Sequence, residues 1–527
     1  KLKSYLFSIL FFVSTCCFGQ ESPNFLWLIC EDQSLFFSMY GDSNANTPNI
    51  DLLAEEGTIY HSCYTPSPVC APSRSSLITG MYPTTLGTQH MRAFKKSAEK
   101  NEINSHNSLP YYSPKPKKPV RFFTEDLRAK GYYCTNNSKE DYNMITSPLA
   151  WDESSQTAHW RNRQMDQPFF SVFNFNITHE SNIWKNSFNY SKKEIENIHV
   201  PDFFPENDAI KIDLLTNYKN IEKLDKQIGT IIDQLKADGL YENTIIFFFS
   251  DHGGPLPRYK RSIYETGLRV PMVVKWIDNN EIRNNFQLVS FVDFAPTILD
   301  VAKIEREFAF EGVSFFKKNQ RDYIYAAADR FDSYTDMRRS IRGGNFKLIY
   351  NSDTAAPIYN PIRYRKKMKT MQLLDSLFTK QQLNTYFTNW FSKNKDRFEL
   401  YNVAEDYFEL NNLINSPNHQ EIFKELESQL LKWMDVSDFG YMTESKMLNS
   451  MFTSSMIRPK LDVPRLIVNE LGFIIESNNL NASVGWRNKN ETVWNVYKKN
   501  DLINPEDDFE VIVFQPGYEI LIKSFKK

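Results

Sequence analysis

Two uninterrupted apolar segments constrain the fold of this chain more than any other feature. Pro23 to Cys30 reads Pro-Asn-Phe-Leu-Trp-Leu-Ile-Cys, and Thr244 to Ser250 reads Thr-Ile-Ile-Phe-Phe-Phe-Ser. Such runs are typical of parallel strands that are buried on both faces. Each run ends in polar residues, Glu31-Asp32 and Asp251-His252. Because ligands of open α/β sheets bind at the carboxyl ends of the strands, these two pairs predict one shared site.

Helix signals between the two runs favour an α/β fold. Thr47-Pro48 predicts the start of a helix and Gly57 its end. Pro72 to Gly80 predicts a second, short helix, and apolar residues recur at helical spacing from Tyr218 to Leu235. Since that third helix leads directly into the run at 244–250, we expect strands and helices to alternate.

The chain of 527 residues is long enough for one large α/β domain and a smaller one. We expect an N-terminal α/β domain at 21–355 and a C-terminal subdomain at 356–460. Residues 465–527 alternate short apolar runs with turns and predict a small β module. The 62 basic and 64 acidic residues nearly balance, which argues against a globally basic nucleic-acid binder.

Residues 1–20 resemble a secretory signal peptide. Lys1 and Lys3 precede the apolar run Tyr5 to Val13, and small residues follow it. No later apolar stretch approaches 18 residues, so we expect no transmembrane segment in the mature chain, which would be periplasmic or secreted. Val13 to Cys16 loosely resembles a lipoprotein cleavage box, which leaves a lipid anchor open.

The segment from Cys70 to Gly80 carries the most chemical information. It reads Cys-Ala-Pro-Ser-Arg-Ser-Ser-Leu-Ile-Thr-Gly and places Cys70 just before the predicted helix. Backbone N–H groups and the helix dipole at such a position favour a bound anion or a polarised nucleophile. Arg74 lies one turn further and can point back to the same place. A cysteine without this context would more often be a small buried apolar residue.

The Cys-x-Pro-Ser-Arg pattern followed by Leu-x-Thr-Gly resembles the activation motif of the type I, formylglycine-dependent sulfatases. The resemblance implies an alkaline-phosphatase-like fold, with a large mixed β-sheet flanked by helices and a smaller C-terminal β-sheet. In that family a maturation enzyme oxidises the cysteine, here Cys70, to formylglycine (3-oxoalanine). One hydroxyl of the hydrated aldehyde then attacks sulfur and forms a covalent sulfate ester, and the other expels sulfate. The implied activity is that of a sulfuric ester hydrolase.

The resemblance also implies one Ca²⁺ per chain. Its ligands would be Glu31, Asp32, Asp251, His252 and the modified Cys70, although most members have aspartate where Glu31 stands. Independently of the family, carboxylates gathered at one sheet edge repel each other unless a cation neutralises them. The alternative is that they are ordinary carboxylates at strand ends.

Three further positions match catalytic residues of the family. Lys139 matches the lysine of a Lys-x-His pair, but Asp141 stands where the histidine is usual, so the role of orienting the formylglycine hydrate stays open. Lys260 falls on the sulfate-binding lysine, where an ammonium offsets charge on the transferred group. His179 follows the apolar run Phe169 to Asn176 and matches the histidine that faces the bridging ester oxygen, a suitable proton donor.

The substrate-pocket candidates are His90, Arg92, Asp329 and Arg330. The first two follow the activation segment closely, and Arg92 suits bidentate contact with an anion. The other two follow a strand-like run at 323–327. For all four, a pocket role and a scaffold role are equally open.

The runs Thr85 to Arg92 and Asn136 to Tyr142 most resemble those of secreted bacterial sulfatases of polysaccharide degradation, some of them similar to sulfamidases. This implies a sulfated polysaccharide or oligosaccharide as substrate, either algal, such as ulvan, or glycosaminoglycan-like. Two alternatives stay open. Relatives on this fold that use the same formylglycine are phosphodiesterases or phosphonate hydrolases, and Asp141 leaves room for a catalytically silent protein that binds sulfated glycans.

Overall fold

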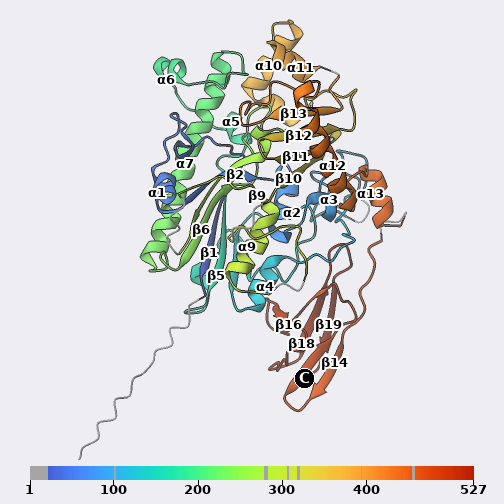
Figure 1. Ribbon diagram of the computed structural model, residues 1–527. Coiled ribbons are helices and arrows are strands. Elements are labelled where there is room, and N and C mark those ends of the chain that lie inside the picture. The colour runs from blue at the N-terminus through green and yellow to red at the C-terminus, as the bar shows by residue number, and fades with distance from the viewer. Residues whose placement is uncertain are drawn as a thin grey trace, which may run out of the picture.

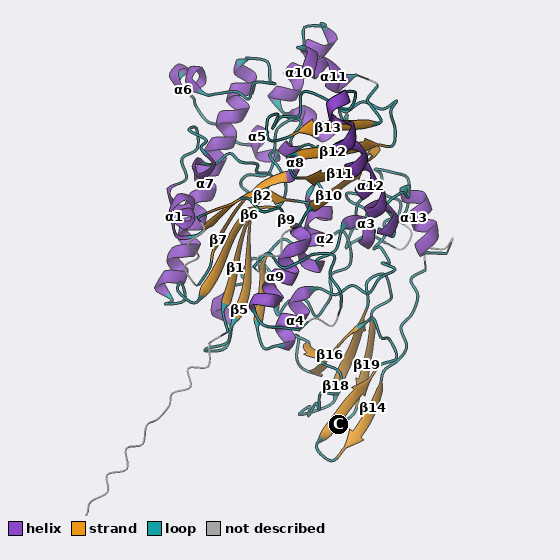
Figure 2. Cartoon of the chain, in the orientation of Figure 1, coloured by secondary structure: helices purple, strands orange, loops and turns teal. Residues whose placement is uncertain are grey.

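The computed structural model describes residues 22–99, 102–277, 283–305, 308–316, 321–392, 394–453 and 457–527. The predicted signal peptide at 1–20 lies outside these residues. A large mixed β-sheet lies between two layers of helices, and smaller antiparallel sheets follow toward the C-terminus (Figures 1 and 2). Among the described residues, no helix combines the length and the apolar character that a membrane crossing requires.

The main sheet has nine strands in the order β4-β3-β5-β1-β6-β7-β2-β8, with β9 also paired to β2. At its centre, β1 pairs in parallel with both β5 and β6, as the apolar runs predict, whereas β7 is antiparallel to β6 and β2. The strands are β1 (Asn24–Cys30), β2 (Thr58–Tyr64), β3 (Tyr133–Asn137), β4 (Glu153–Ser154), β5 (Phe169–Phe175), β6 (Thr244–Ser250), β7 (Arg269–Lys275), β8 (Asn284–Asn285) and β9 (Val289–Ser290).

The alternation of side chains along β1 explains why its sequence is apolar throughout. Leu26 and Leu28 belong to the core on one face of the sheet, and Phe25 and Trp27 belong to the core on the other. The first core is covered by α1 and α7 and the second by α2, α4 and α9 (Figure 1). The helices up to this point are α1 (Pro48–Glu56), α2 (Cys70–Thr79), α3 (Pro83–Leu86), α4 (Phe123–Ala129), α5 (Ser181–Lys185), α6 (Lys192–Asn197), α7 (Asp208–Ala237), α8 (Glu265–Leu268) and α9 (Phe294–Val301).

A second sheet of four antiparallel strands follows the main one. Its order is β10 (Tyr323–Phe331), β11 (Tyr334–Gly343), β12 (Phe346–Asn351) and β13 (Phe398–Asn402). The amphipathic helix α12 (Gln420–Val436) packs on it through a shared apolar cluster. The predicted domain boundary at 355 lies between β12 and β13 and therefore falls inside this sheet. The remaining helices of this part are α10 (Lys369–Thr379), α11 (Thr385–Phe391) and α13 (Glu444–Met451).

The C-terminal segment forms two small antiparallel sheets within the predicted β module. One pairs β14 (Arg465–Asn469) with β15 (Gly472–Glu476), and the other has the order β17-β16-β18-β19. The strands of the second sheet are β16 (Ser483–Asn488), β17 (Asn495–Tyr497), β18 (Phe509–Phe514) and β19 (Leu521–Phe525). These sheets lie beside α4 (Figure 1). The predicted α/β class, with a large flanked sheet and smaller C-terminal sheets, is confirmed.

Candidate active site

The two polar pairs that follow β1 and β6 meet at the carboxyl edge of the main sheet. The backbone N–H of Asp251 donates to the carbonyl of Cys30, and the N–H of Asp32 donates to Oδ1 of Asp251 over 3.2 Å. Glu31, Asp32, Asp251 and His252 are all buried. The parallel register of the two strands thus brings together residues that are 220 positions apart.

Cys70 opens α2 and faces the same cluster. Its Sγ lies 3.2 Å from Nε2 of His252. One turn along α2, Nε of Arg74 donates to Oδ2 of Asp251 over 3.2 Å, and Nη1 donates to Oδ1 of Asn174 over 2.6 Å. The third nitrogen, Nη2, is buried and makes no hydrogen bond in the described part of the chain, although Oε1 of Glu31 lies 3.9 Å from it. This buried N–H group next to Cys70 suits an anionic ligand.

The two predicted catalytic lysines pair with the carboxylates that follow β1. Nζ of Lys139 lies 2.6 Å from Oε1 of Glu31, and Nζ of Lys260 lies 2.8 Å from Oδ2 of Asp32. His179 lies beside Glu31 and Asp32 and makes a 2.9 Å hydrogen bond between Nδ1 and the hydroxyl of Ser181. The structure therefore brings these three predicted residues to the same place.

Asp141 lies at the edge of the cluster. Its carboxylate is 3.7 Å from Nζ of Lys139, and its side chain is about one third exposed (36%). Asp141 thus contacts the cluster through Lys139, and its taking over of the histidine role stays a prediction.

Glu180 is a charged member of the cluster that sequence reasoning missed. Its fully buried carboxylate holds Arg261 through two hydrogen bonds, of 2.7 and 2.9 Å, and lies 3.4 Å from Nζ of Lys260. Its backbone N–H donates to Asp32 over 2.6 Å. The available signal was its position directly after His179 at the end of β5.

The charges of the cluster shift the pKa values of its members. Burial alone would raise the pKa of Asp251, but the charges of His252 and Arg74 lower it to about 2. Burial would lower the pKa of His252, but Asp251, Cys70 and Asp32 raise it to about 10. The pKa values of Lys139 and Lys260 are raised, because neighbouring anions outweigh their burial. Both lysines are therefore charged at neutral pH.

Several residues in and around the cluster have left-handed backbone conformations that residues other than glycine rarely adopt. The φ angles are 54° at Asp32, 51° at Asp141, 69° at Arg261, 59° at Arg92 and 51° at Asp332. Such conformations persist where surrounding contacts enforce them, and they concentrate at functional sites. Here the left-handed backbone lets neighbouring charged residues, such as Glu31 and Asp32, point their side chains toward different partners.

Two glycines allow the loop after β6 to pack closely. The N–H of Gly253 donates to the carbonyl of Gly267 over 3.0 Å. A Cβ at Gly253 would lie 2.1 Å from the Thr266 carbonyl, and one at Gly267 would lie 2.0 Å from the Ser262 carbonyl. Any larger residue would push apart the segments that carry His252 and Lys260.

The donor set fits a divalent cation. Atoms of Asp32, Cys70 and His252 lie within 4.8 Å of one another, as do atoms of Glu31, Asp32 and His179. Carboxylate oxygens are the ligands that Ca²⁺ prefers. Unbalanced negative charge is not the argument for a cation here, because lysine and arginine side chains already pair with the carboxylates. Binding at Nε2 of His252 would require that nitrogen to lose its proton.

The four predicted substrate-pocket residues lie in different environments. Asp329 is buried and paired with Arg339 at 2.8 Å, and Arg330 is buried in a bidentate pair with Glu444. His90 is also buried, 3.9 Å from Glu444. Only Arg92 of the four lines the large cavity beside the cluster. Direct substrate contact by the three buried residues stays a prediction that this geometry does not favour.

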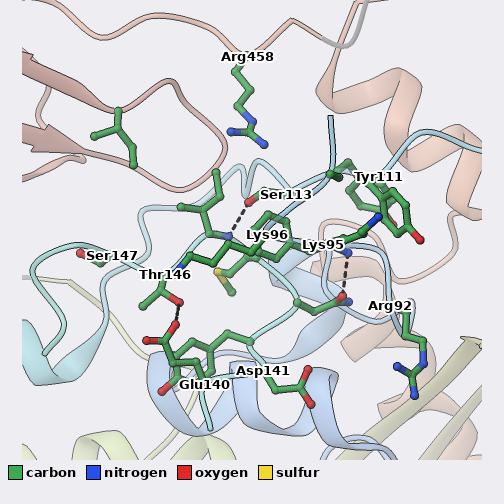
Figure 3. A pocket seen from close by; sticks show the side chains of 18 of the residues that line it. Arg92, Lys95, Lys96, Tyr111, Ser113, Glu140, Asp141, Thr146, Ser147 and Arg458 are labelled. Carbon is green, nitrogen blue, oxygen red and sulfur yellow. Dashed lines mark hydrogen bonds between the residues drawn. The ribbon is translucent and has the colours of Figure 1, made fainter. Parts of the chain in front are cut away.

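This cavity has a volume of about 1230 Å³. Arg92 and Asp141 lie on its wall (Figure 3). Through Asp332, which is 2.7 Å from Arg92 and 3.3 Å from Arg261, charged contacts continue from the cavity to the buried cluster. The site is thus an anion-compatible centre with an adjoining space large enough for an extended ligand.

Comparison with known proteins places this arrangement in a family. The sulfatase family profile matches residues 23–304, and the profile described as "N-sulphoglucosamine sulphohydrolase, C-terminal" matches residues 258–385. The chain belongs to the sulfatase family. An ulvan-active sulfatase of Formosa agariphila is 39% identical over 95% of this chain and 90% of that protein. Human N-sulphoglucosamine sulphohydrolase is 23% identical over 78% of this chain and 89% of that enzyme.

Solved structures agree on the fold. A 2-O GAG sulfatase has a TM-score of 0.58 and 16% identity, covering 80% of this chain and 94% of that one. A protein solved in complex with its substrate D-glucosamine-2-N,6-O-disulfate has a TM-score of 0.55 and 16% identity, covering 80% and 99%. The predicted alkaline-phosphatase-like fold and sulfuric ester hydrolase activity are confirmed. Sulfatases of this family generally use a formylglycine and a metal ion.

Proposed function

We propose that this sulfatase removes sulfate from a sulfated polysaccharide or its oligosaccharides, with ulvan as the first substrate to test. The 39% identity to an ulvan-active sulfatase over nearly the whole chain supports the substrate class. A glycosaminoglycan-like substrate is the second candidate, since more distant relatives include an N-sulphoglucosamine sulphohydrolase. The observation that carries the reaction is the position of Cys70, beside His252 and among three permanently charged cations.

In this proposal Cys70 is the residue that maturation converts to formylglycine, whose hydrated aldehyde supplies the nucleophilic hydroxyl. Its place at the start of α2 is favourable, since the helix dipole and free N–H groups stabilise negative charge there. Lys139 and Lys260 would stabilise the negative charge of the transferred SO₃ group. Arg74 would offer Nη2, which makes no hydrogen bond in the described part of the chain, to a sulfate oxygen, while its other nitrogens keep it fixed to Asp251 and Asn174.

His179 is the proposed proton donor to the leaving alcohol. The charge of Lys260 and, secondarily, burial lower the pKa of its imidazole in the ligand-free chain. A sulfate ester bound between Lys260 and His179 would place a negative charge that counters this effect and favours the imidazolium. The 2.9 Å hydrogen bond to Ser181 would hold the ring in position.

A Ca²⁺ ion is the proposed metal, with Glu31, Asp32, Asp251 and His252 as its ligands. It would supply positive charge beside the reacting sulfate and a fixed point for the residue at position 70. The leader-like residues 1–20 support export to the periplasm or beyond, where the enzyme would meet a large polymer. A formylglycine-generating enzyme would then be a required partner of the chain.

The test measures sulfate release from ulvan oligosaccharides by the chain without substitutions and by Cys70→Ala, each produced together with a maturation enzyme. We expect release by the first only, and a Cys70 peptide that has lost sulfur and gained oxygen by mass spectrometry. A matched Cys134→Ala variant, which changes a buried cysteine on β3, controls for general effects.

Paired sulfate and phosphate esters separate this proposal from the phosphodiesterase or phosphonate hydrolase alternative, since preferred turnover of the phosphate ester would favour the latter. Binding of sulfated oligosaccharide with no release by a fully matured chain would favour a silent glycan-binding protein. Equal release by Cys70→Ala would refute the covalent role of this residue.

A further inference from the structure

One side of the large cavity is formed by C-terminal residues that are far in sequence from the catalytic residues. Its walls come from 92–113, from 140–154, and from the C-terminal residues Phe452, Ile457, Arg458, Glu519 and Ile520. Arg458 precedes the terminal β module and Glu519 lies near its end. The N–H of Glu519 donates to the carbonyl of Pro459 over 3.0 Å, so the two parts of this wall are joined.

The terminal module is docked firmly enough to form a fixed wall. Nη2 of Arg128, on α4, donates to the carbonyl of Trp494 over 2.6 Å. The hydroxyl of Ser483 hydrogen bonds with Glu125, which is buried, and Phe514 belongs to the apolar core beneath the main sheet. These contacts anchor the module to the catalytic domain over polar and apolar surface.

Two cations line this cavity, the exposed Lys96 and the half-buried Arg458. Figure 3 shows Arg458 reaching in from one side, with Lys96, Arg92 and Asp141 on the other. Among the described residues, neither Lys96 nor Arg458 makes a hydrogen bond or an ion pair, whereas Arg92 is held by Asp332. Burial lowers the pKa of Arg458, and the charge of Glu519 only partly opposes this effect. A partly desolvated guanidinium without a close partner favours an anionic ligand.

The cavity also contains acidic side chains, and their positions matter. Glu140 is engaged by the hydroxyls of Thr146 and Ser154, and Asp141 lies beside Lys139. Of the four acidic residues in the lining, Glu140 and Asp141 lie toward the catalytic cluster, whereas Glu99 lies close in sequence to Lys96 and the charge of Glu519 acts on Arg458. At about 1230 Å³ the space exceeds the 300–1,000 Å³ range of pockets for small ligands, so it has room for more than one sugar.

We propose that this cavity is a second binding subsite, in which Lys96 and Arg458 hold an anionic group, sulfate or carboxylate, on a sugar next to the one that loses its sulfate. The terminal module then serves substrate binding by completing the cavity. The inference rests on the proposed function for its choice of ligand. It predicts that the enzyme prefers oligosaccharides to small sulfate esters, and that the preference depends on residues outside the catalytic cluster.

The experiment measures binding and therefore does not depend on turnover. A Cys70→Ala background is titrated calorimetrically with an ulvan tetrasaccharide, alone and combined with Arg458→Ala or Lys96→Ala. Each cavity variant should weaken binding about tenfold, which is the low end for a hydrogen bond to a charged group. The control is Arg465→Ala, an exposed arginine on β14 outside the cavity lining, which should leave the affinity within twofold.

The same titration with the chemically desulfated tetrasaccharide identifies the bound anion. Loss of the Arg458 effect assigns it to a sulfate, and a retained effect assigns it to a carboxylate. Unchanged affinity in both cavity variants, or absence of binding by the Cys70→Ala background, would overturn the subsite. Failure of the proposed function has a different signature, namely no sulfate release from any substrate by the matured chain without substitutions.

Discussion

Glu180 provides the sharpest test of how the buried cluster is held together. Glu180→Gln keeps the size of the side chain but removes a charge that faces both Arg261 and Lys260. All three side chains are almost fully buried, so the two cations would lose a partner where water cannot replace it. Breaking a buried ion pair from one side typically costs about 3–5 kcal/mol.

This cost can be converted into a melting temperature. An unfolding entropy of about 2.1 cal/mol/K per residue, applied to a cooperative unit the size of the family match at 23–304, gives a shift of about 1.7 °C per kcal/mol. We therefore expect Glu180→Gln to melt about 5–9 °C below the unmodified chain in differential scanning calorimetry. Glu222→Gln is a matched control on a partly exposed pair with Lys219, worth about 0–1 kcal/mol, and should shift the midpoint by less than 2 °C.

Enzyme activity distinguishes a role of Glu180 in positioning Lys260 from a purely stabilising role. With Glu180 neutral, Asp32 is the one carboxylate of the described chain that still pairs with Lys260, so its ammonium is less well placed for the sulfate group. At a temperature where both proteins are folded, kcat should fall at least tenfold in Glu180→Gln. The reasoning is refuted if the variant melts within 2 °C of the unmodified chain, because the pair would then contribute no more than a surface contact.

Two further predictions concern the metal and pH. Asp251→Ala should lower bound Ca²⁺, measured by elemental analysis, to a small fraction of that in an Asp233→Ala control with an exposed carboxylate removed; full occupancy would place the ion elsewhere. Burial raises the pKa of Asp213 to about 6, so the folded state binds the carboxyl proton more tightly than the unfolded state does. The bound proton therefore stabilises the folded state fully below about pH 4, and this stabilisation is lost as pH rises through 6. Asp213→Asn can still accept the hydrogen bonds from Thr370. In thermal melts it should be more stable than the chain without substitutions by about 3 kcal/mol at pH 7.5, and the two stabilities should converge near pH 4. A difference in stability that does not depend on pH would contradict this.

The sequence predicts the centre of the site because local patterns carry it. The continuous apolar runs identify β1 and β6, and their parallel register alone brings Asp32 and Asp251 together. Pro72 and Gly80 predict the helix α2 and its end, although α2 begins two residues earlier than expected, at Cys70 itself, which lies next to the two aspartates. These features depend on strand burial and helix signals, which a single sequence reveals.

The partners of the charged groups could not be predicted in the same way. Arg330 pairs with Glu444 and Asp329 with Arg339, through contacts that no local spacing encodes. A sequence alone therefore does not distinguish an arginine that is available to bind a substrate from one that is already paired with a carboxylate inside the protein. The left-handed backbone at Asp32, a non-glycine residue, is likewise imposed by its surroundings.

The charge balance of the cluster connects the metal to substrate binding. Four buried carboxylates face four permanent cations, so these groups alone leave little net attraction for a sulfate ester; they are Glu31, Asp32, Asp251 and Glu180, and Arg74, Lys139, Lys260 and Arg261. His252, whose pKa is raised to about 10, adds a positive charge until metal binding at Nε2 removes its proton. Attraction must then come from added positive charge or from cations without partners. A divalent ion would supply the first at the cluster, and Lys96 and Arg458 supply the second in the cavity. On this argument, removal of the metal weakens binding of small sulfate esters more than that of oligosaccharides, because only the latter reach the two unpaired cations.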